Sequence, residues 1–116
     1  MDYAALFEVT GWAGTEHFIC LGDDAPGVLS AFMSQQDLRC LLDMGRMEER
    51  GRAKKELDKI ERLLTAYDDY DLEIGDLEGF SVSLRDGSIS CEAIASSEAE
   101  VEKLLASHPE AKVCRF

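Results

Sequence analysis

The sequence predicts a single α+β domain over residues 1–116, with a mainly antiparallel sheet of about five strands and helices on one face. Two stretches alternate apolar and polar residues on either side of a glycine-containing turn, which is typical of β-hairpins. Helix-start signals and a long amphipathic stretch lie after them. The predicted element order is therefore ββ-α-α-α-ββ-α-β. With 46% apolar residues, the chain can form one hydrophobic core.

The first predicted hairpin spans residues 3–21 and turns at residues 11–14, Gly-Trp-Ala-Gly. A four-residue loop gives cross-strand pairs that match in character. These pairs are Thr10 with Thr15, Phe7 with Phe18, and Glu8 with His17. Trp12 sits in the loop itself. We expect its ring to pack back on the core, and the alternative is an exposed anchor for a partner.

Two short helices are predicted next. Asp24 ahead of Pro26 is a helix-start signal, which favours a helix through about Met33. Ser34 resembles the N-cap of a second helix, which Gly45 ends or kinks. Both helices would follow the first hairpin directly.

The longest helical pattern runs over residues 46–67 and carries one apolar stripe. The stripe consists of Ala53, Leu57, Ile60, Leu64 and Tyr67. It covers about two heptads, which is too short for a coiled coil. The helix is expected to pack on the domain or on one partner helix.

Residues 68–78 form an acidic connector, in which acids alternate with apolar residues. Its six acids are Asp68, Asp69, Asp71, Glu73, Asp76 and Glu78, with Tyr70 among the interleaved residues. Alternate acids resemble a calcium loop, but Ile74 stands where the turn needs glycine. We expect an ordered connector with an acidic outer side.

The second hairpin is predicted from Asp86-Gly87, a two-residue type I′ turn signal. Pairing Arg85 with Ser88 places six side chains on the core face. They are Phe80, Val82, Leu84, Ile89, Cys91 and Ala93. Ser97 and Glu100 then form a capping box for a last helix that ends at His108-Pro109, and residues 112–116 form a final strand.

Charge is the most informative bulk property, because 12 bases against 24 acids give a net charge of −12. Residues 46–62 hold seven bases and five acids, +2, which leaves 5 bases and 19 acids, −14, elsewhere. Such a surface disfavours direct nucleic-acid binding, which requires cations at the phosphates. No apolar run is long enough for a membrane span, and the start lacks a secretory signal, so we expect a cytoplasmic protein without membrane contact.

The motifs of catalysis and cofactor binding are missing from the sequence. Neither a phosphate-binding loop nor a G-x-G-x-x-G stretch occurs. The cysteines, Cys20, Cys40, Cys91 and Cys114, form no C-x-x-C pair, so we expect buried reduced thiols. We therefore expect no enzyme, no metal and no cofactor.

The sequence accordingly favours a small acidic binding module that docks on a positively charged, nucleic-acid-handling protein. An anti-defence inhibitor, a toxin-immunity protein or another nucleic-acid mimic would share these properties. The expected contact residues are Asp68, Asp69, Tyr70, Asp71, Glu73, Asp76, Glu78 and Trp12. One alternative is a small enzyme or ligand-binding domain, homodimeric through a sheet edge or residues 46–67. Another is a structural subunit of a larger assembly.

Overall fold

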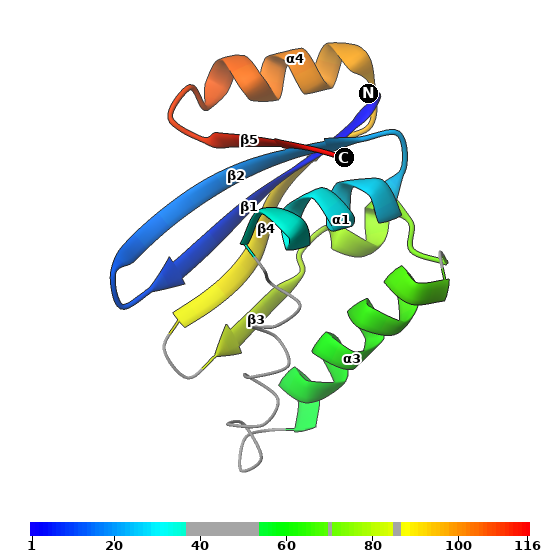
Figure 1. The fold of residues 1–116 in the computed structure, drawn as a ribbon, viewed down its shortest axis with the longest axis vertical. Coiled ribbons are helices and arrows are strands. Elements are labelled where there is room, and N and C mark those ends of the chain that lie inside the picture. The colour runs from blue at the N-terminus through cyan, green and yellow to red at the C-terminus, as the bar shows by residue number, and fades with distance from the viewer. Residues whose placement is uncertain (37–53, 70, 85–86) are drawn as a thin grey trace.

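The computed structural model describes residues 1–36, 54–69, 71–84 and 87–116. In chain order, the elements are β1 (Tyr3–Gly11), β2 (Gly14–Gly22), α1 (Ala25–Gln36), α3 (Lys54–Asp69), the 3-10 helix η1 (Ile74–Leu77), β3 (Ser81–Leu84), β4 (Gly87–Ala95), α4 (Glu98–Ser107) and β5 (Lys112–Arg115). The five strands form one sheet in the order β3-β4-β1-β2-β5 (Figure 1). Every neighbouring pair is antiparallel except β2 with β5. The predicted α+β class and mainly antiparallel sheet are confirmed.

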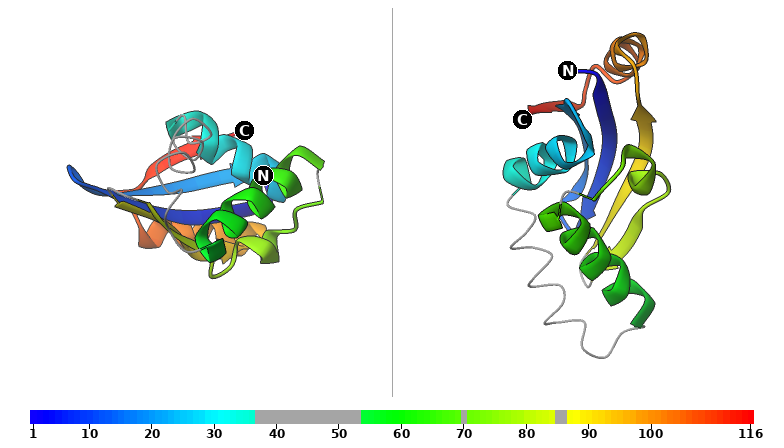
Figure 2. Two further views of the ribbon diagram at one scale, coloured as in Figure 1. Left: turned by 90° about the horizontal axis from the view of Figure 1, so that it is seen from below. Right: turned by 90° about the vertical axis from the view of Figure 1, so that its right-hand side faces the viewer.

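Helices cover both faces of the sheet. Alternation along β1 directs Ala5 and Phe7 into a core with α1 and α3, and Ala4 and Leu6 into a smaller core with α4. Figure 2 shows α1 and α3 on one side of the sheet and α4 on the other. The expectation of helices on one face therefore holds for α1 and α3 and is wrong for α4, since the first hairpin is apolar on both sides.

The first hairpin has the predicted register. Thr10 pairs with Thr15, Phe7 with Phe18 and Glu8 with His17. The ladder continues one step further, because Gly11 pairs with Gly14. Trp12 and Ala13 alone form the turn, and Gly14 follows it with φ +128°, a conformation that favours glycine.

The second hairpin differs from its predicted register by two residues. Leu84 pairs with Gly87, whereas the Asp86-Gly87 turn signal places Arg85 opposite Ser88; residues 85–86 lie outside the described part. Such a shift keeps the same side chains on each face, because strand side chains repeat every second residue. Val82 and Ile89 are therefore still buried in the main core.

A β-bulge in β4 overturns the predicted position of Ala93. Phe7 pairs with Cys91 and Leu6 with Ala93, so Glu92 is an extra residue opposite β1. The side chains after it change faces. Ala93 packs against the α4 core, whereas Ile94 packs against the main one.

Helix α1 begins as predicted but is longer. The Asp24 carboxylate accepts a hydrogen bond of 2.7 Å from the Gly27 amide, which caps the first turn. The helix runs through Ser34 to Gln36, so a second helix starting at Ser34 is wrong. The predicted end at Gly45 lies outside the described residues.

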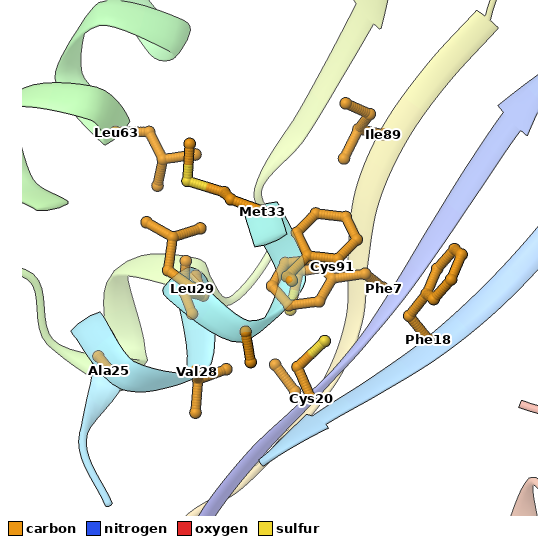
Figure 3. Packing of buried hydrophobic residues seen from close by; sticks show 14 of the residues in the cluster. Phe7, Phe18, Cys20, Ala25, Val28, Leu29, Met33, Leu63, Ile89 and Cys91 are labelled. Carbon is orange, nitrogen blue, oxygen red and sulfur yellow. The ribbon is translucent and has the colours of Figure 1, made fainter. Parts of the chain in front are cut away.

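The main core lies between the sheet, α1 and α3. The Phe7 and Phe32 rings stack with centroids 3.9 Å apart. Figure 3 shows Leu63 of α3 pointing toward Met33 of α1. Helix α3 thus packs within the monomer, which agrees with one of the two expectations for residues 46–67; residues 46–53 lie outside the described part.

The last helix and strand follow the predicted boundaries closely. Ser97 caps α4, because its side-chain oxygen accepts a hydrogen bond of 3.3 Å from the Glu100 amide. His108 follows the last residue of the helix. β5 then pairs with β2 in parallel, at one edge of the sheet.

Candidate functional site

The acidic connector is a defined turn built by its own side chains. After α3 ends, the Asp71 amide donates a hydrogen bond of 3.1 Å to the Ala66 carbonyl. The Asp76 carboxylate accepts a hydrogen bond of 3.0 Å from the Glu73 amide. The Glu73 side chain accepts one from the Asp76 amide in return, which makes a capping box at the start of η1. Two of the six acids therefore hold the local backbone.

The connector buries its apolar residues and exposes its acids. Leu72 and Leu77 are 6% and 0% exposed and belong to the main core. The exposed side chains are Asp68, Asp69, Asp71, Glu73, Asp76 and Glu78. Tyr70 lies outside the described residues. This alternation fixes the connector to the core and leaves a row of carboxylates at the surface.

The acidic surface continues onto α3, which the sequence reasoning missed. Asp58, Glu61 and Asp69 of α3 line an open depression of about 450 Å³ together with Asp71 of the connector. Arg62 contributes the basic side chain there. Residues 58, 61, 65 and 69 are spaced 3, 4 and 4 apart, so one helix face carries them. This spacing could have shown that the acidic surface extends onto α3. The net positive charge of residues 46–62 obscured it.

A second hollow, of about 370 Å³, lies between η1 and the bulge in β4. Gly75 and Gly79 leave room at its wall, because a Cβ on either would meet nothing within 4 Å. Glu78 of the connector and Glu92 of the bulge both line it. The bulge thus adds a carboxylate from the sheet beside the connector, which sequence alternation does not reveal.

Trp12 is the most exposed large apolar residue described, at 91%. The expectation that it packs back on the core is wrong. β4 pairs with β1 only as far as Thr10, and β5 with β2 only from Phe18 onward, so the hairpin end projects past its neighbours. Figures 1 and 2 show this end on the opposite side of the molecule from the connector. The structure therefore separates Trp12 from the acidic residues.

The hairpin end is held by side-chain contacts across its strands. The Thr10 and Thr15 hydroxyl oxygens lie 3.2 Å apart at hydrogen-bonding distance. Further along, His17 Nε2 lies 3.1 Å from Glu8 Oε2. These contacts hold the backbone that carries Trp12, so little backbone freedom is lost when the ring meets a partner.

The described cysteines are buried and free. Burial raises the pKa of Cys20, Cys91 and Cys114, so these thiols are poor nucleophiles at neutral pH. Among residues 1–36, 54–69, 71–84 and 87–116, no cluster of three His, Cys, Asp or Glu side chains could hold a metal ion. Within the same residues, no helix combines the length and apolar character needed to span a membrane.

Comparisons with protein-family models, with curated proteins and with solved structures give no match for this chain. Its function must therefore be inferred from the chemistry of its own surface. Two features stand out there. One is the acidic surface formed by the connector and the outer face of α3, and the other is the exposed Trp12 at the opposite end.

Proposed function

We propose that this chain is a small acidic binding module whose connector and outer α3 face dock on a positively charged protein. The observation that carries the proposal is the exposed row of carboxylates over residues 68–78, fixed to the core by Leu72 and Leu77. A row of fixed negative charge attracts a basic surface and orients it before contact. The net charge of −12 adds to this attraction.

The partner class that fits best is a nucleic-acid-handling protein. Such proteins bind phosphates through Lys and Arg side chains, and exposed carboxylates can form ion pairs with the same side chains. A chain that does so neutralises its partner without touching nucleic acid itself. An anti-defence inhibitor or a toxin-immunity protein of this kind would act in this way.

The hollow beside the connector gives the proposed interface a point of specificity. Glu78 and Glu92 line it from two different elements. A Lys or Arg side chain of the partner could enter and pair with both carboxylates. Its insertion would fix the register of the complex more sharply than the exposed row alone.

Trp12 is proposed as a separate contact. Its position at the other end of the molecule means that a partner touching both surfaces must extend across the sheet. An exposed Trp on a rigid turn is a suitable anchor for an apolar pocket. Contact through Trp12 would depend little on salt, unlike contact through the connector.

The proposal is tested with two triple charge reversals that change the net charge equally, from −12 to −6. The test variant replaces Asp69, Asp71 and Glu78 with Lys; Glu73 and Asp76 are spared because they form the η1 cap. The control variant replaces the exposed Asp2, Glu102 and Glu110 with Lys. Each protein and the wild type would be used to capture binding partners from the native host, and the retained basic protein would be identified and purified.

The affinity of the wild type and of each variant for the purified partner is then measured by titration at two salt concentrations. We expect the test variant to bind at least tenfold more weakly, about 1.4 kcal/mol, and the control to stay close to wild type. Wild-type affinity should fall as salt rises, because exposed charges are screened over about 8–10 Å at physiological ionic strength. Equal weakening of both variants would show that total charge matters and the connector does not, which would refute the proposed site.

A further inference from the structure

Cys20 and Cys114 face each other directly across the parallel pair of strands β2 and β5. Both side chains lie in the main core on the α1 side, 0% and 3% exposed. Two thiols from opposite ends of the chain thus lie on the same face of neighbouring strands at one edge of the sheet.

Strand spacing distinguishes this pair from the third described cysteine. Adjacent strands lie about 4.8 Å apart, within the range of about 4.4–6.8 Å between the Cα atoms of a disulfide. Cys91 lies on β4, and β1 separates β4 from β2. Two spacings make about 9.6 Å, beyond the limit of about 7 Å for a bridge. Among the described cysteines, only Cys20 and Cys114 lie on strands close enough for a disulfide.

We propose that Cys20 and Cys114 are a reversible redox pair, which a low-molecular-weight disulfide oxidises to an intramolecular disulfide that locks β5 onto β2. Both cysteines are free in the fold described above, so the bond would be an addition to it. Its effect falls on β5, which has a neighbouring strand on one side only.

The position of β5 explains how buried thiols become reachable. This edge strand has four residues, and an ion pair of 3.6 Å between Lys112 and Glu16 holds its start. Local opening of a short edge strand requires far less energy than global unfolding. Opening exposes Cys114, whereas Cys20 stays in β2, which is paired with β1 over nine residues.

The reaction then proceeds by two exchanges. The Cys114 thiolate attacks one sulfur of the oxidant, forms a mixed disulfide and releases the first thiolate of the oxidant. As β5 returns, and before it covers Cys20 again, the Cys20 thiolate attacks the Cys114 sulfur and releases the second thiolate of the oxidant. Two protein thiols become one disulfide, the oxidant is reduced to two thiols, and these take up the two protons.

Parallel geometry makes the bond easy to reduce again. Directly opposite residues in parallel strands keep their side chains near the strand spacing of about 4.8 Å, whereas the Cβ atoms of a relaxed disulfide lie about 3.8 Å apart. The bridged pair is therefore strained. Strained disulfides have more oxidising potentials and belong to the labile, regulatory kind.

The test uses glutathione disulfide as the oxidant and the intact chain in four forms. These are wild type, Cys91→Ser as the matched buried control, and Cys114→Ser and Cys114→Ala, of which Ala keeps a small apolar group if Ser disturbs the core. Peptide mapping by mass spectrometry identifies the linked cysteines. Hydrogen exchange follows the amides of residues 112–115, and the reductant dithiothreitol tests reversal.

We expect a Cys20–Cys114 link in wild type and in Cys91→Ser, and no such link in either Cys114 variant. The amides of β5 should exchange at least tenfold more slowly after oxidation, and dithiothreitol should restore the original rate. Absence of oxidation, links through Cys40 alone, glutathione adducts that never resolve, or unchanged exchange of β5 would each overturn the proposal.

Discussion

The hydroxyl of Tyr67 donates a hydrogen bond of 3.0 Å to the Oγ of Ser30 and thereby joins α3 to α1. Ser30 is the one buried polar side chain among the described residues, at 8% exposure. Tyr67 lies two residues before the end of α3, where the connector begins. The bond therefore positions the proposed binding surface from within the core.

Replacement of Tyr67 by Phe should destabilise the protein by about 1–2 kcal/mol, because it removes the partner of a buried hydroxyl. Urea unfolding measures the change. Tyr3→Phe is the matched control, since Tyr3 is also half-buried and its change should stay within about 0.5 kcal/mol. Adding Ser30→Ala to Tyr67→Phe should cost little more. Equal effects of the two Tyr variants would mean that the bond contributes nothing.

The face of α3 was only partly predictable from helical spacing. Tyr67 belongs to the predicted stripe and packs on the core. Leu63 is also buried in the core, although the predicted stripe omits it. Residue 63 lies three positions after residue 60, so a small rotation of the helix brings it to the core side. That rotation depends on the angle at which α3 meets α1, which is a property of the tertiary packing.

The two hairpins show where strand patterns suffice. Matched pairs such as Glu8 with His17 identify one register of the first hairpin. In the second, a shift of two residues preserves both faces, so the hydrophobic pattern accepts either register. A separate constraint on β4 is its close approach to β1. A Cβ on Gly87 would overlap the Thr10 carbonyl oxygen, so the first residue of β4 must be glycine.

Gly87→Ala should therefore destabilise the protein by about 3 kcal/mol or more, because two backbones must move apart. Thermal or urea unfolding gives the value. Gly75→Ala is the control, since its Cβ would point into open space. If Gly87→Ala is as mild as Gly75→Ala, the observed register of β4 against β1 is wrong.

The sequence identified the acidic residues of the candidate site in the connector but not how far the acidic surface extends. Acidic residues in a connector are recognisable from sequence, because charges rarely lie in a core. That Asp58 of α3 and Asp71 of the connector line the same depression could not be predicted, because it depends on the path that the chain takes after α3. Exposure of Trp12 depends on where β4 and β5 stop pairing with the first hairpin, which no local pattern encodes.

Stability should fall in alkaline solution through the Cys91 thiol. Burial, followed by the nearby carboxylates of Glu92 and Glu78, raises the pKa of this thiol to about 11, whereas its ordinary value is 9.0. Below pH 9 both states are protonated and stability is unaffected. Between pH 9 and 11 the unfolded chain loses its proton first, so stability falls, by about 3 kcal/mol in total.

Urea unfolding under reductant at a series of pH values checks this fall. The variant Cys91→Ala lacks the thiol, so its stability should decline less steeply between pH 9 and 11. The difference between the two curves isolates Cys91 from other groups that titrate there. Parallel curves for the two proteins would contradict the effect of burial on this thiol.

The exposure of Trp12 predicts the fluorescence of the free protein, because the chain has one tryptophan. Its emission maximum should match that of a fully hydrated indole and shift little on unfolding. Quenching by neutral acrylamide should exceed quenching by iodide, since the net charge of −12 repels anions. Trp12→Ala should change stability by less than about 0.5 kcal/mol.

The same signal reveals how a partner sits on the molecule. A partner confined to the acidic surface leaves Trp12 in water, so the emission should stay unchanged while the complex forms and should be insensitive to salt. A partner that spans both surfaces buries the ring and moves the emission to shorter wavelength. In that case, Trp12→Ala should weaken binding by an amount that persists at high salt, because apolar contacts are not screened. The weakening caused by the triple Lys variant of Asp69, Asp71 and Glu78 should become smaller as salt rises, because charge contacts are screened.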